Sequence, residues 1–151
     1  MRLGSLIRPE LIFPDLAAAD RLEVLRIFSR RLAEQGLVAD ADELYGKLLE
    51  REQLGSTGIG SGIAIPHCKI KGLKQGIVAV ALARDGVSFG AADGVPVRLF
   101  FLVVSPSESP AEHLQILAAI SRWVKTDRHA ERLLELADKE AIGELLRGEG
   151  G

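Results

Sequence analysis

A chain of 151 residues with 47% hydrophobic and 26% charged residues has the composition of an ordinary globular protein. We expect one domain over residues 1–151, because this length suffices to bury a core. The 19 basic and 21 acidic side chains leave a formal net charge of -2, which excludes a strongly basic nucleic-acid surface. No apolar run reaches the roughly 18 residues of a membrane span or resembles a secretory signal. A single cysteine, Cys68, forms no internal disulfide, so the sequence predicts a cytoplasmic protein.

Two amphipathic helices are predicted in the first third of the chain. The first covers about 20–35, and Gly36 stands where helices commonly end. The second begins after Asp40, a capping residue with Glu43 three positions later, and ends near residue 53. The apolar stripes expected to be buried are Leu22, Leu25, Phe28 and Leu32 in the first helix, and Leu44, Leu48 and Leu49 in the second.

Strand-like segments follow a stretch in which four glycines lie between residues 55 and 62. Residues 63–65 form a short apolar piece, and Pro66 favours an extended conformation for the residue before it. Residues 77–83 and 97–104 are nearly continuous apolar runs rich in β-branched side chains. Such runs are typical of strands that are covered on both faces, so these two should form the centre of a sheet.

A short antiparallel excursion is predicted between the two long strands. Turn signals at Asp85 and Gly86 and at Asp93 and Gly94 bracket residues 87–89, whose pattern indicates a separate short strand.

A third helix has a well-marked beginning. Ser109 is a candidate cap, Pro110 suits the first helical position, and Glu112 lies three residues after the cap. His113 then falls in the first turn, on the stripe that continues through Leu117, Ile120 and Val124, and should face inward or toward a cleft. Two shorter helices complete the chain, at about 129–136 and 140–146. The elements predict an α/β (α+β) fold, with helices packed on a mixed sheet.

The glycine-rich segment does not match either common nucleotide-binding loop. A Walker A loop requires Lys followed by Ser or Thr after its last glycine, but Gly60 is followed by Ser61 and Gly62. A dinucleotide-binding loop requires a glycine where Ile63 stands. Both kinds of site are therefore excluded.

What remains is a flexible backbone whose N–H groups can form a concave nest for anionic oxygens. The candidate phosphate contacts around it are the hydroxyls of Ser56, Thr57 and Ser61 and the guanidinium of Arg51. Pro66 fixes the chain just before His67, so an imidazole should lie at the end of an extended segment beside this loop.

Histidine suits reversible phosphoryl transfer, because a neutral ring nitrogen can attack phosphorus and the resulting N–P bond is labile. The protein then mainly positions groups and offsets charge. Arg51 can bind two phosphoryl oxygens at once, and a second imidazole, for which His113 is the candidate, can donate a further hydrogen bond. His67 is thus a candidate phosphoryl acceptor, and a histidine that ends a strand without a catalytic role is the alternative.

At this point the sequence resembles a known family. Residues 51–67, REQLGSTGIGSGIAIPH, resemble the signature of the fructose- and mannitol-type (type 2) enzyme IIA domains of the bacterial phosphoenolpyruvate-dependent phosphotransferase system. The resemblance continues through Asp93 to Val104 and at residues 112–114, so it covers nearly the whole chain. Within the family, the STGIG form and the expected single domain are most similar to the nitrogen-regulatory IIA members.

The resemblance implies a mixed sheet flanked by helices, with His67 phosphorylated on Nε2 and with Arg51 and His113 lining the site. It implies no cofactor, and a histidine phosphocarrier protein as the phosphoryl donor. Two outputs are implied: a nitrogen-type regulatory protein that docks on target proteins according to its phosphorylation, or a sugar-transport component that passes phosphate to a separate IIB protein.

Other interpretations of the same residues are less favoured. A metal site built from His67, Cys68, His113 and His129 lacks the two close ligand pairs usual in structural zinc sites. Cys68 as a nucleophile would need a base, and His67 beside it should point elsewhere on an extended chain. Cys68 also stands where many relatives carry glycine, which affects how closely a partner backbone can approach. We expect His129 to lie on a polar helix face without a functional role.

Overall fold

A mixed sheet forms the centre of the structure, a computed structural model that describes residues 1–126 and 128–148. Its strands in the described residues are β1 (Ile12–Phe13), β2 (Gly58–Gly60), β3 (Ile63–Ala64), β4 (His67–Ile70), β5 (Ile77–Val87) and β6 (Val97–Pro106). The order across the sheet is β1-β5-β6-β3-β2, and β4 also pairs with β6. The two long strands, β5 and β6, are antiparallel neighbours at the centre, as the apolar runs predicted.

β3 and β4 lie one after the other along the same edge of β6, both parallel to it. The interruption between them falls at Ile65 and Pro66. The Pro66 carbonyl still accepts a hydrogen bond from the N–H of Val103 (2.9 Å). Proline, which has no N–H to donate, is thus accommodated at a break between strands, and the pairing resumes at His67.

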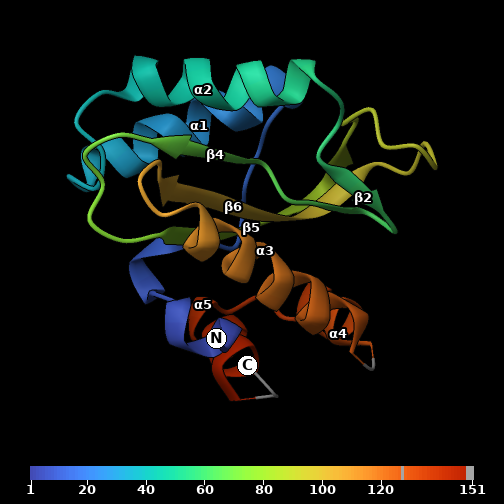
Figure 1. Cartoon of the computed structure of the whole chain (residues 1–151). Coiled ribbons are helices and arrows are strands. Elements are labelled where there is room, and N and C mark those ends of the chain that lie inside the picture. Colours follow the sequence, from blue (N-terminus) through green and yellow to red (C-terminus); the bar gives the residue numbers. More distant parts are fainter. Residues whose placement is uncertain (127, 149–151) are drawn as a thin grey trace.

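Helices cover both faces of the sheet (Figure 1). The helices on one face are α1 (Arg21–Glu34) and α2 (Ala41–Gln53), and those on the other are α3 (Pro110–Lys125), α4 (His129–Leu134) and α5 (Lys139–Gly148). Two 3₁₀ turns, η1 (Leu3–Leu6) and η2 (Pro9–Leu11), bring the N-terminus beside α5. The predicted α/β architecture, a mixed sheet flanked by helices, is confirmed.

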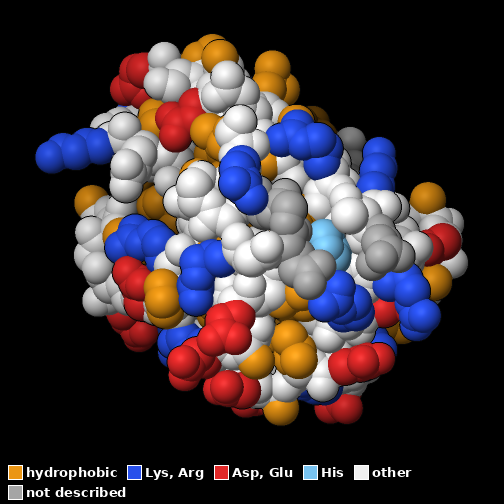
Figure 2. Space-filling view, turned by 90° about the horizontal axis from the view of Figure 1, so that it is seen from below, with side chains coloured by type: hydrophobic (Ala, Val, Ile, Leu, Met, Phe, Trp, Pro, Cys, Tyr) orange, Lys and Arg blue, Asp and Glu red, His pale blue; other side chains and the backbone are white. Residues whose placement is uncertain are grey.

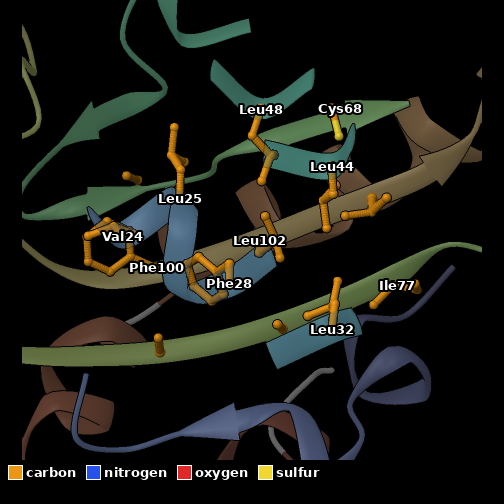
Figure 3. Packing of buried hydrophobic residues seen from close by; sticks show 14 of the residues in the cluster. Val24, Leu25, Phe28, Leu32, Leu44, Leu48, Cys68, Ile77, Phe100 and Leu102 are labelled. Atoms are coloured by element: carbon orange, nitrogen blue, oxygen red, sulfur yellow. The ribbon is translucent and has the colours of Figure 1, made fainter. Parts of the chain in front are cut away.

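The core on the α1 and α2 side is built from the stripes of these two helices and one face of the sheet (Figure 3). Phe28 is fully buried, and its ring lies 6.3 Å from the rings of both Phe13 and Phe100. Truncation of such a ring to alanine typically costs about 3–5 kcal/mol. One predicted core position is wrong: Leu22 is 45% exposed, and Val24 is buried instead.

The predicted cap is confirmed in α2 but not in α3, and α1 begins at a cap that was not predicted. Asp20 accepts a hydrogen bond from the N–H of Glu23, and Asp40 accepts from Asp42 and Glu43. Ser109 makes no side-chain capping bond, although Pro110 does begin the helix. Glu112 accepts instead from the N–H of Gly76, so its carboxylate holds the loop before β5.

The predicted short strand at 87–89 is wrong, because β5 continues without a turn to Val87. The pairing of β5 with β6 shifts register between Leu82 and Val87, where the sequence predicted a turn. Val87 still pairs with Val97 beyond this irregularity. Gly86 has φ of +80°, and a Cβ there would lie 2.9 Å from Pro96. Glycine at this position therefore permits a bulge, and the chain turns only afterwards.

Candidate active site

His67 is the first residue of β4, and the alternation of that strand decides where its side chain points. Cys68 and Ile70 join the core on the α1 and α2 side, so His67 and Lys69 project from the opposite face of the strand. His67 pairs in register with Val103 on β6 and is only partly buried. The imidazole is therefore fixed at its base by the sheet, with its ring near the surface.

The hydrogen bonds of His67 determine which ring nitrogen carries the proton. Nδ1 lies 2.7 Å from the carbonyl oxygen of Ile65. Since a carbonyl can only accept, Nδ1 must carry the hydrogen, and Nε2 of the neutral ring keeps its lone pair. Burial, partly offset by the Ile65 hydrogen bond, lowers the pKa of His67 below 6.5. The ring is thus neutral at pH 7, and Nε2 is its nucleophilic atom.

Arg51, in the last turn of α2, reaches this nitrogen. Its Nε donates to Nε2 of His67 over 3.3 Å, while its Nη1 donates to the carbonyl of Gly55 over 2.9 Å. The guanidinium therefore lies between the glycine-rich loop and the reactive nitrogen. Its long hydrogen bond to His67 can be exchanged for bonds to an anionic oxygen at the same place.

His113, in the first turn of α3, is the second imidazole of the site. Its ring centroid lies 5.4 Å from that of His67, at an interplanar angle of 50°. It is 6% exposed, and its Nδ1 lies 2.8 Å from the hydroxyl oxygen of Ser105. Burial and the nearby His67 lower the pKa of His113 to about 4, so this ring is also neutral at pH 7. The structure brings together the three residues predicted to form the site, while their catalytic roles stay predictions.

The hydroxyls of the loop are engaged within the protein. Thr57 is 4% exposed, and both its N–H and its hydroxyl donate to the carboxylate of Glu52. Ser56 donates to the carbonyl of Phe89 and accepts from the N–H of Gly58. In this state both residues hold the loop in shape, and their contact with a phosphoryl group stays a prediction.

Two carboxylates that sequence reasoning missed also fix this loop. Glu52 is 3% exposed, and it lies four residues after Leu48 on the buried stripe of α2, which was the signal available in the sequence. The carboxylate of Asp93 accepts from the N–H of Ser61 at 2.8 Å. Part of the predicted anion nest is thus occupied by a carboxylate of the protein itself.

The alternative sites are not supported by the geometry. Across residues 1–126 and 128–148, no group of three or more His, Cys, Asp or Glu side chains is arranged to hold a metal ion. Cys68 is buried away from the surface where a partner would approach, and burial raises the pKa of its thiol to about 12. The thiol is therefore unreactive at neutral pH. Because its side chain lies in the core, Cys68 does not limit how closely a partner backbone can approach.

His129 does not lie on a polar helix face as predicted. It is 3% exposed, its ring stacks on Trp123 with centroids 4.6 Å apart, and its Nδ1 donates to the Trp123 carbonyl over 3.0 Å. The polar residues around it in the sequence concealed a buried position at the junction of α3 and α4. It remains apart from the His67 and His113 pair.

The larger surface features lie elsewhere on the molecule. A cavity of about 860 Å³ lies between α1 and the β1 segment, and its lining includes Phe13, Arg30 and Lys139 but no residue of the histidine pair. On the side of α4 and α5, charged groups of both signs alternate with apolar ones, and acidic groups gather along one edge (Figure 2). No described helix is long and apolar enough to span a bilayer.

Comparison with known proteins agrees with this arrangement. Residues 5–148 match the family described as the phosphoenolpyruvate-dependent sugar phosphotransferase system, EIIA 2. The chain belongs to this family. It is 35% identical over 143 residues to the fructose-specific EIIA component of the phosphotransferase system of Haloferax volcanii, covering 94% of this chain and 93% of that protein.

A second relative of this EIIA protein has a different description. The nitrogen regulatory protein of Bradyrhizobium diazoefficiens is 35% identical over 154 aligned positions, covering 97% of this chain and 95% of that protein. Among solved structures, the nitrogen regulatory protein IIA-Ntr from Neisseria meningitidis superposes with a TM-score of 0.87 at 29% identity, covering 95% of this chain and 97% of that one. Family membership makes the chain a phosphotransfer domain, and sequence identity does not separate the two outputs.

Proposed function

We propose that His67 accepts a phosphoryl group on Nε2 from a phosphorylated histidine phosphocarrier protein. The observation that carries the proposal is the hydrogen bond from Nδ1 to the Ile65 carbonyl, which leaves the lone pair on Nε2. In the transfer, the N–P bond on the donor histidine breaks as the new bond from Nε2 to phosphorus forms, and the donor keeps the electron pair. Positive charge that develops on the ring is stabilised at Nδ1–H by the Ile65 carbonyl.

Arg51 and His113 act on the group being transferred. The Arg51 guanidinium, 3.3 Å from Nε2 in the free protein, turns from the ring nitrogen to the phosphoryl oxygens. His113, with its ring centroid 5.4 Å from that of His67, donates a hydrogen bond to one of these oxygens. Both residues therefore stabilise charge without carrying the phosphate.

Apolar side chains beside the site support docking of another protein. Leu54 follows α2 and is 83% exposed, and Leu114 follows His113 and is 67% exposed. Large apolar side chains this exposed next to a reactive group are typical of a surface that a partner covers. The phosphocarrier protein would bury both leucines while its phosphohistidine meets His67.

The test is phosphorylation with purified components. Incubation with phosphorylated phosphocarrier protein should give one acid-labile, base-stable phosphate per chain, which peptide mapping should locate at His67. His67→Ala should take up none, with its circular dichroism spectrum as the control for folding. Labelling of His67→Ala to the level of the parent would refute the proposal.

For the output, we propose a nitrogen-type regulatory protein whose docking depends on the state of His67. The STGIG loop and the TM-score of 0.87 with IIA-Ntr support this choice. A phosphoryl group adds about two negative charges at neutral pH, enough to change which surface binds. Pull-downs with the phosphorylated and unphosphorylated protein should therefore recover different partners, at least one without IIB character.

The second candidate is a sugar-transport component, favoured by the 35% identity to the fructose-specific protein. In that case phosphate on His67 should pass rapidly to a cysteine of a separate IIB protein, and both states of His67 should recover the same partners. Phosphorylated protein mixed with candidate IIB proteins distinguishes the outputs, since a regulator keeps its phosphate for longer.

A further inference from the structure

Ser105 is a buried hydroxyl near the end of the mostly apolar strand β6, and it is hydrogen-bonded to a residue of the site. It lies on β6, two residues after Val103, which pairs with His67, and its side chain is fully buried. Its oxygen lies 2.8 Å from Nδ1 of His113. In the part of the chain that the structure describes, this hydroxyl has no other hydrogen-bond partner.

The protons of this pair can be assigned by counting donors and acceptors. If Nδ1–H of His113 donated to Ser105, the serine proton would be left without an acceptor among the described residues, at the cost of an unsatisfied buried group. If the hydroxyl donates to Nδ1, the hydroxyl and Nδ1 are both satisfied, and the remaining Nε2–H, unlike the proton of the fully buried serine, keeps some contact with solvent. The proton of the neutral ring must then be on Nε2.

We propose that Ser105 is a positioning residue that holds His113 as the Nε2–H tautomer and so presents a neutral hydrogen-bond donor to the phosphoryl group on His67. The effect of Ser105 on phosphoryl transfer rests on the proposed function, but the tautomer of His113 does not depend on that function. Nε2 of His113 has no hydrogen-bond partner within the described residues, so this donor is available.

The location of His113 explains why a neutral donor is suitable. A cation in the first turn of α3 would be opposed by the positive end of the helix dipole, and burial further disfavours the charge. The ring must therefore donate from its neutral form, in which only one nitrogen carries hydrogen. Without a fixed tautomer, a fraction of the molecules would turn a lone pair toward the phosphoryl oxygens, and those molecules would be repelled.

The first test reads the tautomer directly. Long-range ¹⁵N–¹H correlation spectra of the unphosphorylated protein at pH 7.5 should show His113 as Nε2–H in the parent and as a mixture, or as Nδ1–H, in Ser105→Ala. Nδ1–H as the tautomer of His113 in the parent would overturn the assignment, whatever the phosphorylation assay shows.

The second test measures phosphorylation of His67 by the phosphorylated phosphocarrier protein. Ser105→Ala should lower kcat about tenfold, the effect of losing one ordinary buried hydrogen bond, and leave KM for the donor protein unchanged. Ser105→Thr, which keeps the hydroxyl, should recover most of the rate. The matched control is Ser29→Ala, because Ser29 is also a fully buried serine but donates to the Leu25 carbonyl within α1.

The outcomes separate the two proposals. An altered tautomer in Ser105→Ala with an unchanged kcat would refute the positioning role while leaving phosphorylation of His67 intact. An equal loss of rate in Ser29→Ala would refute it as well, because a general loss of stability would then explain the effect. If the parent is not phosphorylated at all, the proposed function fails, and the spectra still decide the assignment of Ser105.

Discussion

Two regions of the molecule pair a buried histidine with a second aromatic ring, and they differ in what surrounds the ring nitrogens. At the junction of α3 and α4, His129 stacks on Trp123 at an angle of 25° and donates from Nδ1 to a backbone carbonyl. At the start of β4, His67 meets His113 at 50°, and its Nε2 faces the guanidinium of Arg51. The first contact fills space, whereas the second leaves a nucleophilic atom beside a cation.

Burial does not explain this difference. His113 and His129 are 6% and 3% exposed, so accessibility alone would place them in the same class. The neighbouring side chain makes the difference. The indole of Trp123 packs against His129, whereas the guanidinium of Arg51 beside the unprotonated Nε2 of His67 can bind an anion.

The largest difference is expected from removing one histidine of each pair. His113→Ala should be phosphorylated at His67 about a hundredfold more slowly than the parent, because one donor to the transferring group is lost. His129→Gln should be phosphorylated at the parent rate. Rapid-quench labelling measures both, and equal rates for the two variants would remove the distinction between the pairs.

A smaller effect is expected from Arg51→Lys. Lysine keeps the positive charge but cannot bind two phosphoryl oxygens at once, so labelling should slow about tenfold. Arg31→Lys is the matched control, since Arg31 occupies the last turn of α1 as Arg51 does in α2. A rate in Arg51→Lys equal to that of the control would make Arg51 an ordinary helix-end residue.

The third prediction concerns stability and pH. The pKa of His113 is about 4 in the folded protein, against 6.5 for an exposed histidine. Between these values the unfolded chain binds the proton more readily, so stability contributed by neutral His113 is complete above pH 6.5 and falls as the pH drops toward 4. His67, whose pKa is also lowered, acts in the same direction.

Thermal unfolding at pH 7.5 and pH 4.5 measures this effect. The Tm of the parent should fall further than that of His113→Gln, which does not titrate, by about 5–10 °C, because protonation two pH units below 6.5 costs roughly 2.5 kcal/mol and each kcal/mol shifts the Tm by about 2–4 °C in a protein of this size. Acidic residues are common to both proteins and cancel in the comparison. An equal fall in Tm would show that His113 is as easily protonated in the folded chain as in the unfolded one.

The smallest effect is expected at Cys68, next to the reactive residue but on the other face of β4. Cys68→Ala should change the phosphorylation rate of His67 by less than about twofold, since the side chain packs under α2 and its thiol is protonated. Iodoacetamide at pH 8 should modify Cys68 only in denatured protein. Rapid alkylation of the folded chain would contradict its burial.

Much of the fold follows from local signals. Asp40 caps its helix as predicted, and the two apolar runs pair at the centre of the sheet. The failures occur where a distant partner decides. Glu112 was expected to complete a cap, but the N–H of Gly76, 36 residues away, takes its carboxylate. The Gly86 turn signal became a bulge because pairing with β6 continues past it.

The site likewise has features that the sequence predicted and features that depend on distant residues. The residue types of Arg51, His67 and His113, together with the family resemblance, predicted that they meet. The sequence could not show that Thr57 donates to Glu52, or that Ser105 contacts His113, because both depend on which buried polar group lies nearest after folding. His129 was misplaced for a related reason, since its polar neighbours in sequence are not its neighbours in space.

The hydrogen bond between Ile65 and Nδ1 of His67 spans only two residues, with Pro66 between them. The position of the proton on Nδ1 of His67 is therefore determined within residues 65–67 and does not depend on more distant parts of the fold. For protein design, this makes residues 65–67 a portable unit. Grafted onto the start of another parallel strand, the segment should carry its nucleophilic nitrogen with it, leaving only the arginine and the second imidazole to be supplied by the new host.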